Sequence, residues 1–217
     1  MSVVDYNIAE HRQGLIGTEA FGAQLAQDVN FKLTSPATYD YNCIAFAMGV
    51  DDRWVDCADL PWHWWPQPMP RDRSPEGLVA AFEFLGFEKC GLDDSPEVGF
   101  DKVALYAKDD EWTHAARIVD AGVYHSKFGA SFDGQHSGGN VLAAQYGYVY
   151  QIMRRPKAIA ESARAKLGIS PGVVHLQKKV CIDGYEDHLV LFKGHIRLAN
   201  HGNEVELLSD GRVRVIT

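Results

Sequence analysis

The chain has 217 residues, of which 46% are hydrophobic and 23% are charged, so it can bury a full core and is not a disordered protein. Its net charge of -8 and its lack of basic runs argue against general binding to nucleic acid or to an anionic membrane surface. The four cysteines lack the short paired spacing of a zinc site. We therefore predict reduced thiols, no metal and no cofactor.

The first twenty residues lack the basic start, apolar centre and small-residue cleavage site of a signal peptide. No apolar run approaches the length that spans a membrane, so we predict no membrane insertion. We expect synthesis in the cytoplasm. Action elsewhere, such as in a target periplasm, would require a non-classical export route.

A short apolar segment, Cys43–Met48, follows a polar and turn-prone approach and is predicted to be the buried central helix of the domain. A helix N-terminus stabilises negative charge, which would make Cys43 acidic and nucleophilic. The same apolar surroundings would also suit an inert core thiol. The position of Cys43 alone does not decide between the two.

The next segment, Asp51–Arg73, is rich in proline and tryptophan and is predicted to be irregular. Trp64 and Trp65 would bind substrate along a cleft, or would only pack on the core as a lid. His63, beside them, is a rival general base. Ser74 then caps a helix that is predicted to run to about Leu85.

A meander of antiparallel strands is predicted after this helix. Val103–Ala107 has the apolar character of a buried strand, and His114 heads the next strand. The turn at Asp120–Gly122 leads into a return strand at Val123–Ser126. Glycine and polar residues predict a loop from 128 to 140, and a further strand is expected from 146 to 153.

The C-terminal part of the chain is predicted to be a separate β unit. A linker helix over 157–167 is followed by five short strands between Val173 and Ile216, separated by Gly-containing turns. We expect residues 1–155 to form a catalytic domain. Residues 156–217 would form the linker helix and a β-hairpin extension.

The order of Cys43 on a helix, His114 on a strand and His125 on the return strand resembles papain-like cysteine hydrolases of the NlpC/P60 kind. Asn42-Cys43 occupies the place of the family's Asp-Cys pair, whereas Ile44 replaces the serine that follows the family's cysteine. The resemblance covers residues 35 to 155. It implies an α+β papain-like fold with a central helix packed on an antiparallel sheet, plus a small C-terminal β extension.

In this interpretation Cys43 attacks an amide carbonyl and His114 acts as the general base. Tyr41 and Asn42, which precede the nucleophile, would contribute to substrate binding together with the two tryptophans. The alternative for His114 is a structural role, as a histidine at the end of a strand whose hydrogen bonds are made by its neighbours. A nucleophile and base from distant parts of the sequence are usual in such sites.

The third catalytic residue depends on the register of the hairpin that follows His114. A two-residue loop would place His125 on the His114 face, whereas a three-residue loop would place Ser126 there. The resemblance favours His125, and Asp133 and His136 remain alternatives.

The resemblance implies a cysteine peptidase or amidase that cleaves amide or peptide bonds, above all in the stem peptides of bacterial peptidoglycan. Some relatives of this kind are antibacterial toxins exported as type VI secretion effectors. The expected partners are therefore a peptide or peptidoglycan fragment and a secretion or immunity protein. The alternatives are a non-enzymatic binding protein and an acyltransferase that uses the same thioester chemistry.

Overall fold

A computed structural model describes residues 11–12, 22–60 and 63–157, together with the backbone of strands at 174–182, 185–192, 195–198, 204–207 and 213–215. The described strands form one sheet of seven strands, one of five and one of two.

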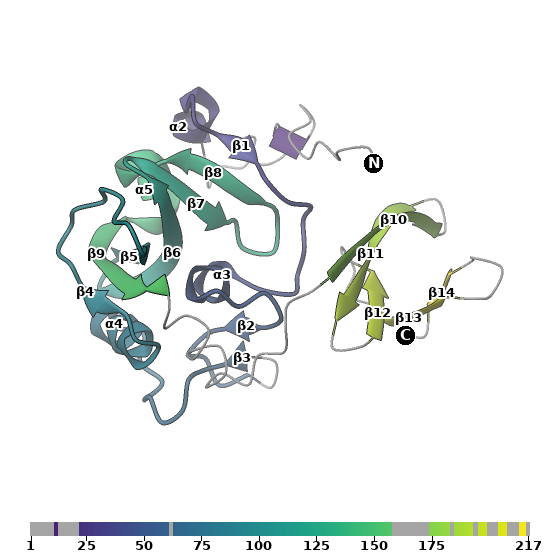
Figure 1. Ribbon diagram of the computed structural model, residues 1–217, viewed down its shortest axis with the longest axis horizontal. Coiled ribbons are helices and arrows are strands. Elements are labelled where there is room, and N and C mark those ends of the chain that lie inside the picture. The colour runs from purple at the N-terminus through teal and green to yellow at the C-terminus, as the bar shows by residue number, and fades with distance from the viewer. Residues whose placement is uncertain are drawn as a thin grey trace.

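The seven-stranded sheet is antiparallel throughout and has the strand order β1-β8-β7-β6-β5-β9-β4. Its strands are β1 (Lys32–Leu33), β4 (Glu88–Lys89), β5 (Phe100–Lys108), β6 (Glu111–Asp120), β7 (Val123–Lys127), β8 (Asp133–Ser137) and β9 (Tyr148–Pro156). The sheet is strongly curved, with β6, β7 and β8 above helix α3 (Cys43–Met48) (Figure 1). Register shifts in the β5–β6, β5–β9 and β6–β7 pairs accompany this curvature, because an extra residue bends a strand.

The described helices are short, and their ends follow from local sequence signals. They are α2 (Gly22–Gln27), α3, α4 (Pro75–Phe84), α5 (Ala143–Tyr146) and the 3₁₀ helix η1 (Gly139–Leu142). In α3 the Asn42 side chain accepts a hydrogen bond from the Ala45 N–H, and Gly49 ends the helix at φ 86°. In α4 the Ser74 side chain accepts from Gly77, as the Ser-Pro start predicted.

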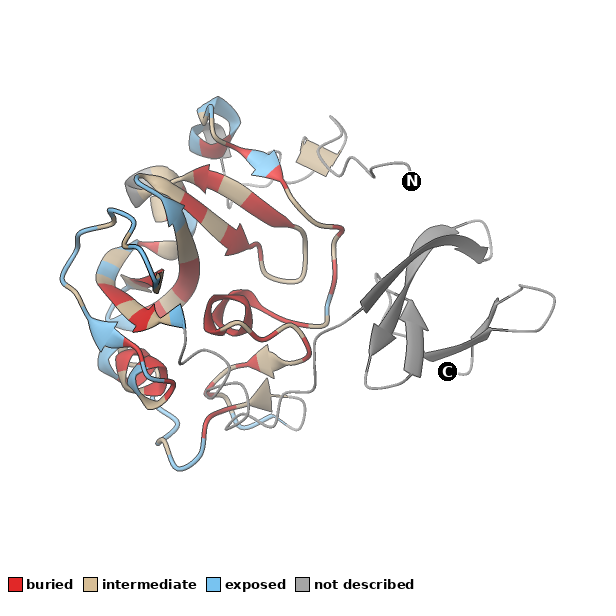
Figure 2. Cartoon of the chain, viewed as in Figure 1, coloured by how far each residue is buried: buried red, intermediate tan, exposed pale blue. Residues whose placement is uncertain are grey.

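Two apolar layers enclose the centre of the sheet. On one face, α3 and α4 pack on alternate residues of β5 and β6, such as Val103, Leu105 and Ala115. On the other face, Ala104 and Tyr106 pack with further strand residues. Burial on both faces explains why β5 has a continuous apolar run instead of an alternating pattern. All of α3 is buried (Figure 2).

The two smaller sheets are built from neighbouring segments of the chain. Strands β2 (Trp54–Val55) and β3 (His63–Trp64) form a parallel pair in the segment that was predicted to be irregular. The five-stranded sheet has the order β10-β11-β12-β13-β14. Its strands are β10 (Val174–Ile182), β11 (Tyr185–Phe192), β12 (His195–Leu198), β13 (Glu204–Leu207) and β14 (Val213–Val215). Apart from Lys157, the predicted linker helix lies outside the described residues.

The predicted α+β papain-like fold with a central helix is wrong. The described domain is dominated by the seven-stranded antiparallel sheet, and α3 has only six residues because Gly49 ends it. The prediction also missed β8 in the expected loop at 128–140. Its sequence, Asp-Gly-Gln-His-Ser, has weak strand propensity, but its backbone pairs with β7 and β1. Tertiary pairing therefore overrides the local preference.

Gly147 and Gly122 provide a matched test of the packing at the start of β9. Both have positive φ, but a Cβ at Gly147 would lie 2.1 Å from the Ala107 carbonyl oxygen, whereas a Cβ at Gly122 would meet nothing within 4 Å. We expect Gly147→Ala to lower the free energy of unfolding by about 3 kcal/mol, through backbone strain and overlap. Gly122→Ala should lower it by about 1 kcal/mol through strain alone. Urea unfolding measures both, and equal losses would contradict the proposed overlap.

Candidate functional site

The β6–β7 hairpin determines which polar side chains lie near His114. Asp120 pairs with Val123 across a two-residue turn, but the register shifts by one residue between Ile118 and Asp120. His125 consequently pairs with Arg117 instead of Ile118. A shift of one residue moves every side chain of β7 to the opposite face. His125 therefore leaves the His114 face, and the next residue along β7, Ser126, takes its place.

His114, Ser126 and His136 form a buried hydrogen-bond chain across β6, β7 and β8. His114 Nε2 lies 2.9 Å from Ser126 Oγ, and Ser126 Oγ lies 2.8 Å from His136 Nε2. His136 Nδ1 lies 2.7 Å from the carbonyl oxygen of Ser137. All three side chains that form the chain are fully buried. Ser126 therefore occupies the place beside His114 that was expected for His125, and His136 hydrogen-bonds to Ser126 from the next strand.

The direction of each hydrogen bond in this chain follows from the Ser137 carbonyl, which can only accept. Burial lowers the pKa of His136 to about 4 and places the pKa of His114 well below its usual value, so both imidazoles are neutral at pH 7. His136 Nδ1–H donates to Ser137, Ser126 Oγ–H donates to His136 Nε2, and His114 Nε2–H donates to Ser126. His114 Nδ1 therefore carries a lone pair.

The lone pair on His114 Nδ1 is buried and has no hydrogen-bond partner among the described residues. Two aromatic rings hold the imidazole in place. The Tyr146 ring stacks on it with centroids 4.1 Å apart, and the Tyr106 ring meets it edge-on at 5.3 Å. The Thr113 hydroxyl donates to the Tyr146 carbonyl at 2.5 Å, which anchors the stacking ring to the same strand. His114 is therefore a rigid, neutral base with one open nitrogen.

Cys43 is the first residue of α3, and its thiol lies against β6. Backbone groups of Ala115, Ile44 and Cys43 itself favour the thiolate, but burial outweighs them and raises the pKa of Cys43 to about 11. Cys43 also lies near Tyr146, since its charge contributes to the raised pKa of that phenol. The thiol thus contacts β6 at Ala115, on the α3 face of the sheet, whereas the His114 side chain lies on the opposite face. No described hydrogen bond joins the thiol to an imidazole.

A second cluster of polar side chains lies near Cys43 on the α3 side of the sheet. The Tyr41 hydroxyl donates to an Asp133 carboxylate oxygen at 2.6 Å. The fully buried Lys127 ammonium donates to the Thr38 carbonyl at 2.9 Å and to the Ser131 carbonyl. Burial lowers the pKa of Lys127 to about 8, and the nearby charges of Asp133 and Cys43 partly oppose that shift.

His125 and Asn42, two other predicted site residues, make hydrogen bonds that stabilise the fold. The His125 imidazole lies 2.5 Å from Thr34 Oγ1 and meets the Phe46 ring edge-on. The Asn42 amide donates to the Val55 carbonyl at 2.9 Å in addition to capping α3. These contacts separate His125 from His114 and occupy the Asn42 side chain.

Trp64 and Trp65 have different surroundings. Trp65 is buried, stacks on Trp112 with centroids 6.1 Å apart, and donates its indole N–H to the Pro70 carbonyl at 2.9 Å. Trp64 is half-buried, with the Arg53 guanidinium 5.5 Å from its ring. The lid interpretation therefore describes Trp65, and only Trp64 retains an exposed surface.

The sequence reasoning missed the role of Tyr146 and gave His136 only as an alternative. His136 lies in the segment predicted to be a loop, so its pairing partner on β7 was not foreseen. One available signal was the alternation of Ser126 and Tyr124 with His125, which places them on the opposite face of β7. Among the described residues, no cluster of three His, Cys, Asp or Glu side chains is suited to bind a metal ion. None of the described helices has the length and apolar character of a membrane span.

The model of a family described as a domain of unknown function, DUF7689, matches residues 32–154. The match covers more than half of the 217 residues. The chain belongs to the DUF7689 family. Comparison with curated proteins and with solved structures gave no match. The DUF7689 match begins at β1 and ends within β9, so it contains the seven-stranded sheet, α3, α4 and the His114–Ser126–His136 chain.

Burial of Cys43 predicts slow alkylation in the folded DUF7689 domain. With its pKa near 11 instead of 9, the thiolate fraction at pH 8 is about 100-fold smaller than in an unfolded chain. We expect iodoacetamide to modify Cys43 more slowly in buffer than in urea, and more slowly than the half-buried Cys90. Peptide mass spectrometry over time measures each rate. Faster reaction of Cys43 in the folded protein would contradict the raised pKa.

The buried, neutral His136 predicts a loss of stability in mild acid. Because its folded pKa is about 4 and its unfolded value is 6.5, the unfolded state binds more protons between these values. Its contribution is complete above pH 6.5 and is lost as the pH falls toward 4. We expect His136→Gln to reduce the pH dependence of the unfolding free energy in this window by about 1.4 kcal/mol per pH unit. Urea unfolding at several pH values tests this, and an unchanged slope would contradict it.

Proposed function

We propose that the DUF7689 domain is a cysteine hydrolase that cleaves amide or peptide bonds, with Cys43 as the nucleophile and His114 as the general base. The observation that supports this most is the open Nδ1 lone pair of a neutral, immobilised His114. The Cys43 thiol contacts the same strand at Ala115, whose side chain lies on the α3 face, opposite to His114. The proposal therefore requires that substrate binding brings the thiol and the imidazole together. A neutral imidazole and a neutral thiol are the reactants that general-base activation requires.

The resting state in this proposal differs from a preformed thiolate. The pKa of Cys43 is raised and that of His114 is lowered, so the proton stays on sulfur until the thiol attacks. As Cys43 Sγ bonds to the amide carbonyl carbon, His114 Nδ1 takes the thiol proton and then gives it to the leaving amine. Water hydrolyses the resulting thioester with His114 again as base, releasing the acid and restoring the thiol.

The hydrogen-bond chain behind His114 suits this proton transfer. His114 Nε2–H donates to Ser126 both before and after Nδ1 gains a proton, so the chain needs no rearrangement. Ser126 in turn is held by His136, whose own direction is set by the Ser137 carbonyl. We therefore assign Ser126 and His136 the positioning role that the sequence analysis gave to His125.

The stem peptides of bacterial peptidoglycan are the proposed substrate, on the strength of the resemblance in the order of Cys43, His114 and the return strand. Export as a type VI secretion effector and an immunity partner follow from the same resemblance and stay predictions. A non-enzymatic interaction protein is the principal competing function. Two observations favour it: Cys43 is buried, and it lies on the opposite face of the sheet from His114.

The proposal is tested with the full chain and purified soluble disaccharide-peptide fragments of peptidoglycan, with products followed by mass spectrometry. We expect the parent to cleave an amide bond and Cys43→Ala to be inactive. His114→Ala should reduce kcat by about 100-fold or more. Ser126→Ala should reduce it by about 10-fold, because the imidazole loses its anchor. Cys90→Ser is the matched control and should retain activity, since a serine can still donate toward the Ile152 carbonyl.

A second readout does not depend on the identity of the substrate. An activated ester, p-nitrophenyl acetate, should transfer its acetyl group to Cys43 in the parent and more slowly in His114→Ala. Circular dichroism establishes that each variant is folded. If cleavage survives in Cys43→Ala, or if neither cleavage nor acetylation depends on His114, the hydrolase proposal is wrong and the interaction protein is favoured.

A further inference from the structure

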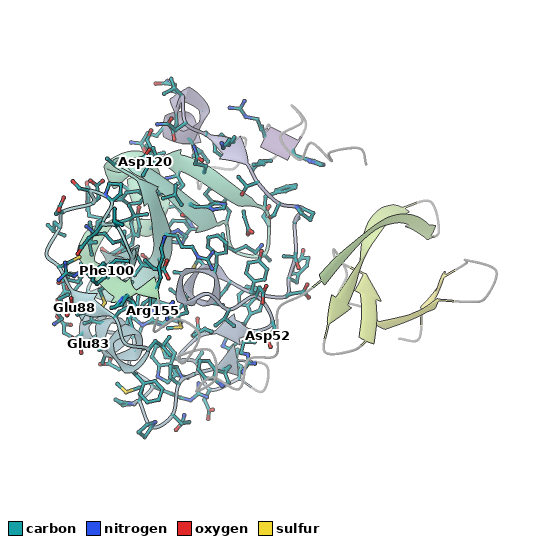
Figure 3. All side chains as sticks on the ribbon, in the orientation of Figure 1. Asp52, Glu83, Glu88, Phe100, Asp120 and Arg155 are labelled. Atoms are coloured by element: carbon teal, nitrogen blue, oxygen red, sulfur yellow. The ribbon has the colours of Figure 1, made fainter. Side chains whose placement is uncertain are left out.

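A cleft with charged walls lies at the opposite end of α3 from Cys43. It has a volume of about 480 Å³ and opens between Ala47, Met48 and Gly49 on one side and the ends of β5, β6 and β9 on the other. Figure 3 labels two of its lining residues, Phe100 and Arg155. Among the described residues that line it, neither Cys43 nor His114 is present. Binding in this cleft is therefore separate from the proposed hydrolysis.

Basic side chains predominate in the cleft, although the chain as a whole has a net charge of -8. Its described lining contains the basic residues Lys102, Arg117, Arg155 and Lys157 and the acidic residues Glu97 and Asp101. Glu97 already accepts hydrogen bonds from Arg154 at 2.8 and 2.7 Å, and the Asp101 carboxylate lies 3.7 Å from Arg155. Both acids thus face cations, which leaves the local charge favourable for an anion.

The basic groups are held by backbone carbonyls and aromatic rings. Arg117 Nε donates to the Phe46 carbonyl at 2.8 Å, and its guanidinium lies 4.1 Å from the Phe46 ring. Lys102 Nζ donates to the carbonyls of Asp93 and Ser95 at 2.6 and 2.9 Å, and it lies 3.9 Å from an Asp93 carboxylate oxygen, so the arginines and Lys157 supply the remaining positive charge. Side chains that are ordered before binding lose less conformational entropy when a ligand arrives.

The remainder of the cleft is apolar. Met48, Phe100, Val103, Ile118 and Val119 contribute to its walls. A guanidinium presents a planar pair of N–H donors that matches a carboxylate. From the combination of basic groups and apolar walls, we infer that the cleft binds a carboxylate attached to a short apolar group. The apolar part lies against the walls and the carboxylate faces the arginines.

Hexanoate is a probe with both parts, and hexanamide is its neutral counterpart. Titration of the full chain carrying Cys43→Ala is followed by ¹⁵N NMR. We expect saturable shifts at Gly49, Val103 and the Nε–H signals of Arg117 and Arg155. Hexanamide should bind about tenfold more weakly, because it lacks the charge. Acetate and inorganic phosphate should also bind more weakly than hexanoate, since neither contacts the apolar walls.

Two variants that each introduce a glutamate, one at the rim of the cleft and one away from it, test where the ligand binds. Val119 lines the cleft and is 50% exposed, so Val119→Glu adds a negative charge without disturbing the core. It should weaken hexanoate binding about fivefold. Val29, 94% exposed and not part of this cleft, gives the control Val29→Glu, which should bind like the parent.

Three outcomes would overturn the inference. These are equal binding of hexanoate and hexanamide, equal binding of hexanoate and phosphate, and equal affinity in the two glutamate variants. Because the readout is binding in a chain that lacks the Cys43 thiol, failure of the hydrolase proposal does not alter the result. Failure of carboxylate binding likewise leaves the hydrolase proposal standing.

Discussion

The one-residue register shift between β6 and β7 is the constraint on which the polar organisation of this domain depends. It places Ser126 on the face of His114 and His125 on the face of Arg117. Without it, the alternation along β7 would put a second imidazole against His114 and a hydroxyl under α3. The two faces of the sheet therefore have different chemistry. One contains the His114–Ser126–His136 chain, and the other contains the charged and phenolic groups around the start of α3.

Buried polar groups are stable only when their hydrogen bonds are satisfied, and the His114–Ser126–His136 chain meets this requirement almost completely. Each donor has an acceptor, from His114 Nε2–H to the Ser137 carbonyl, while the imidazoles avoid the cost of a buried charge by staying neutral. His114 Nδ1 is the exception within the chain. An open acceptor inside a rigid, satisfied network is costly for stability and useful for proton transfer. This contrast connects the packing of the sheet to the proposed chemistry.

Two opposing effects act on Cys43, and burial is the larger. The backbone groups at the start of α3 favour the thiolate, but a helix of six residues in an apolar setting does not compensate for the loss of water. The resting thiol is consequently protonated. A nucleophile in this environment depends on its base at the moment of attack, which is why His114 is decisive for the proposal. The cleft at the other end of α3 has a different character, with basic groups and apolar side chains along its walls.

The sequence by itself determined the local elements: the Asn42-capped segment at Cys43–Met48, the Ser74-Pro75 helix start, the β5–β6–β7 meander, and the turn at Ala121–Gly122. Each depends on near neighbours in the chain, through caps, turns and apolar runs. Only the tertiary structure decided that the fold is a seven-stranded sheet instead of a papain-like domain, because β8 acquires its strand conformation by pairing with β7 and β1. It also decided which residue meets His114. A bulge at Val119 has no distinctive local signal, and a single extra residue reverses every side chain beyond it.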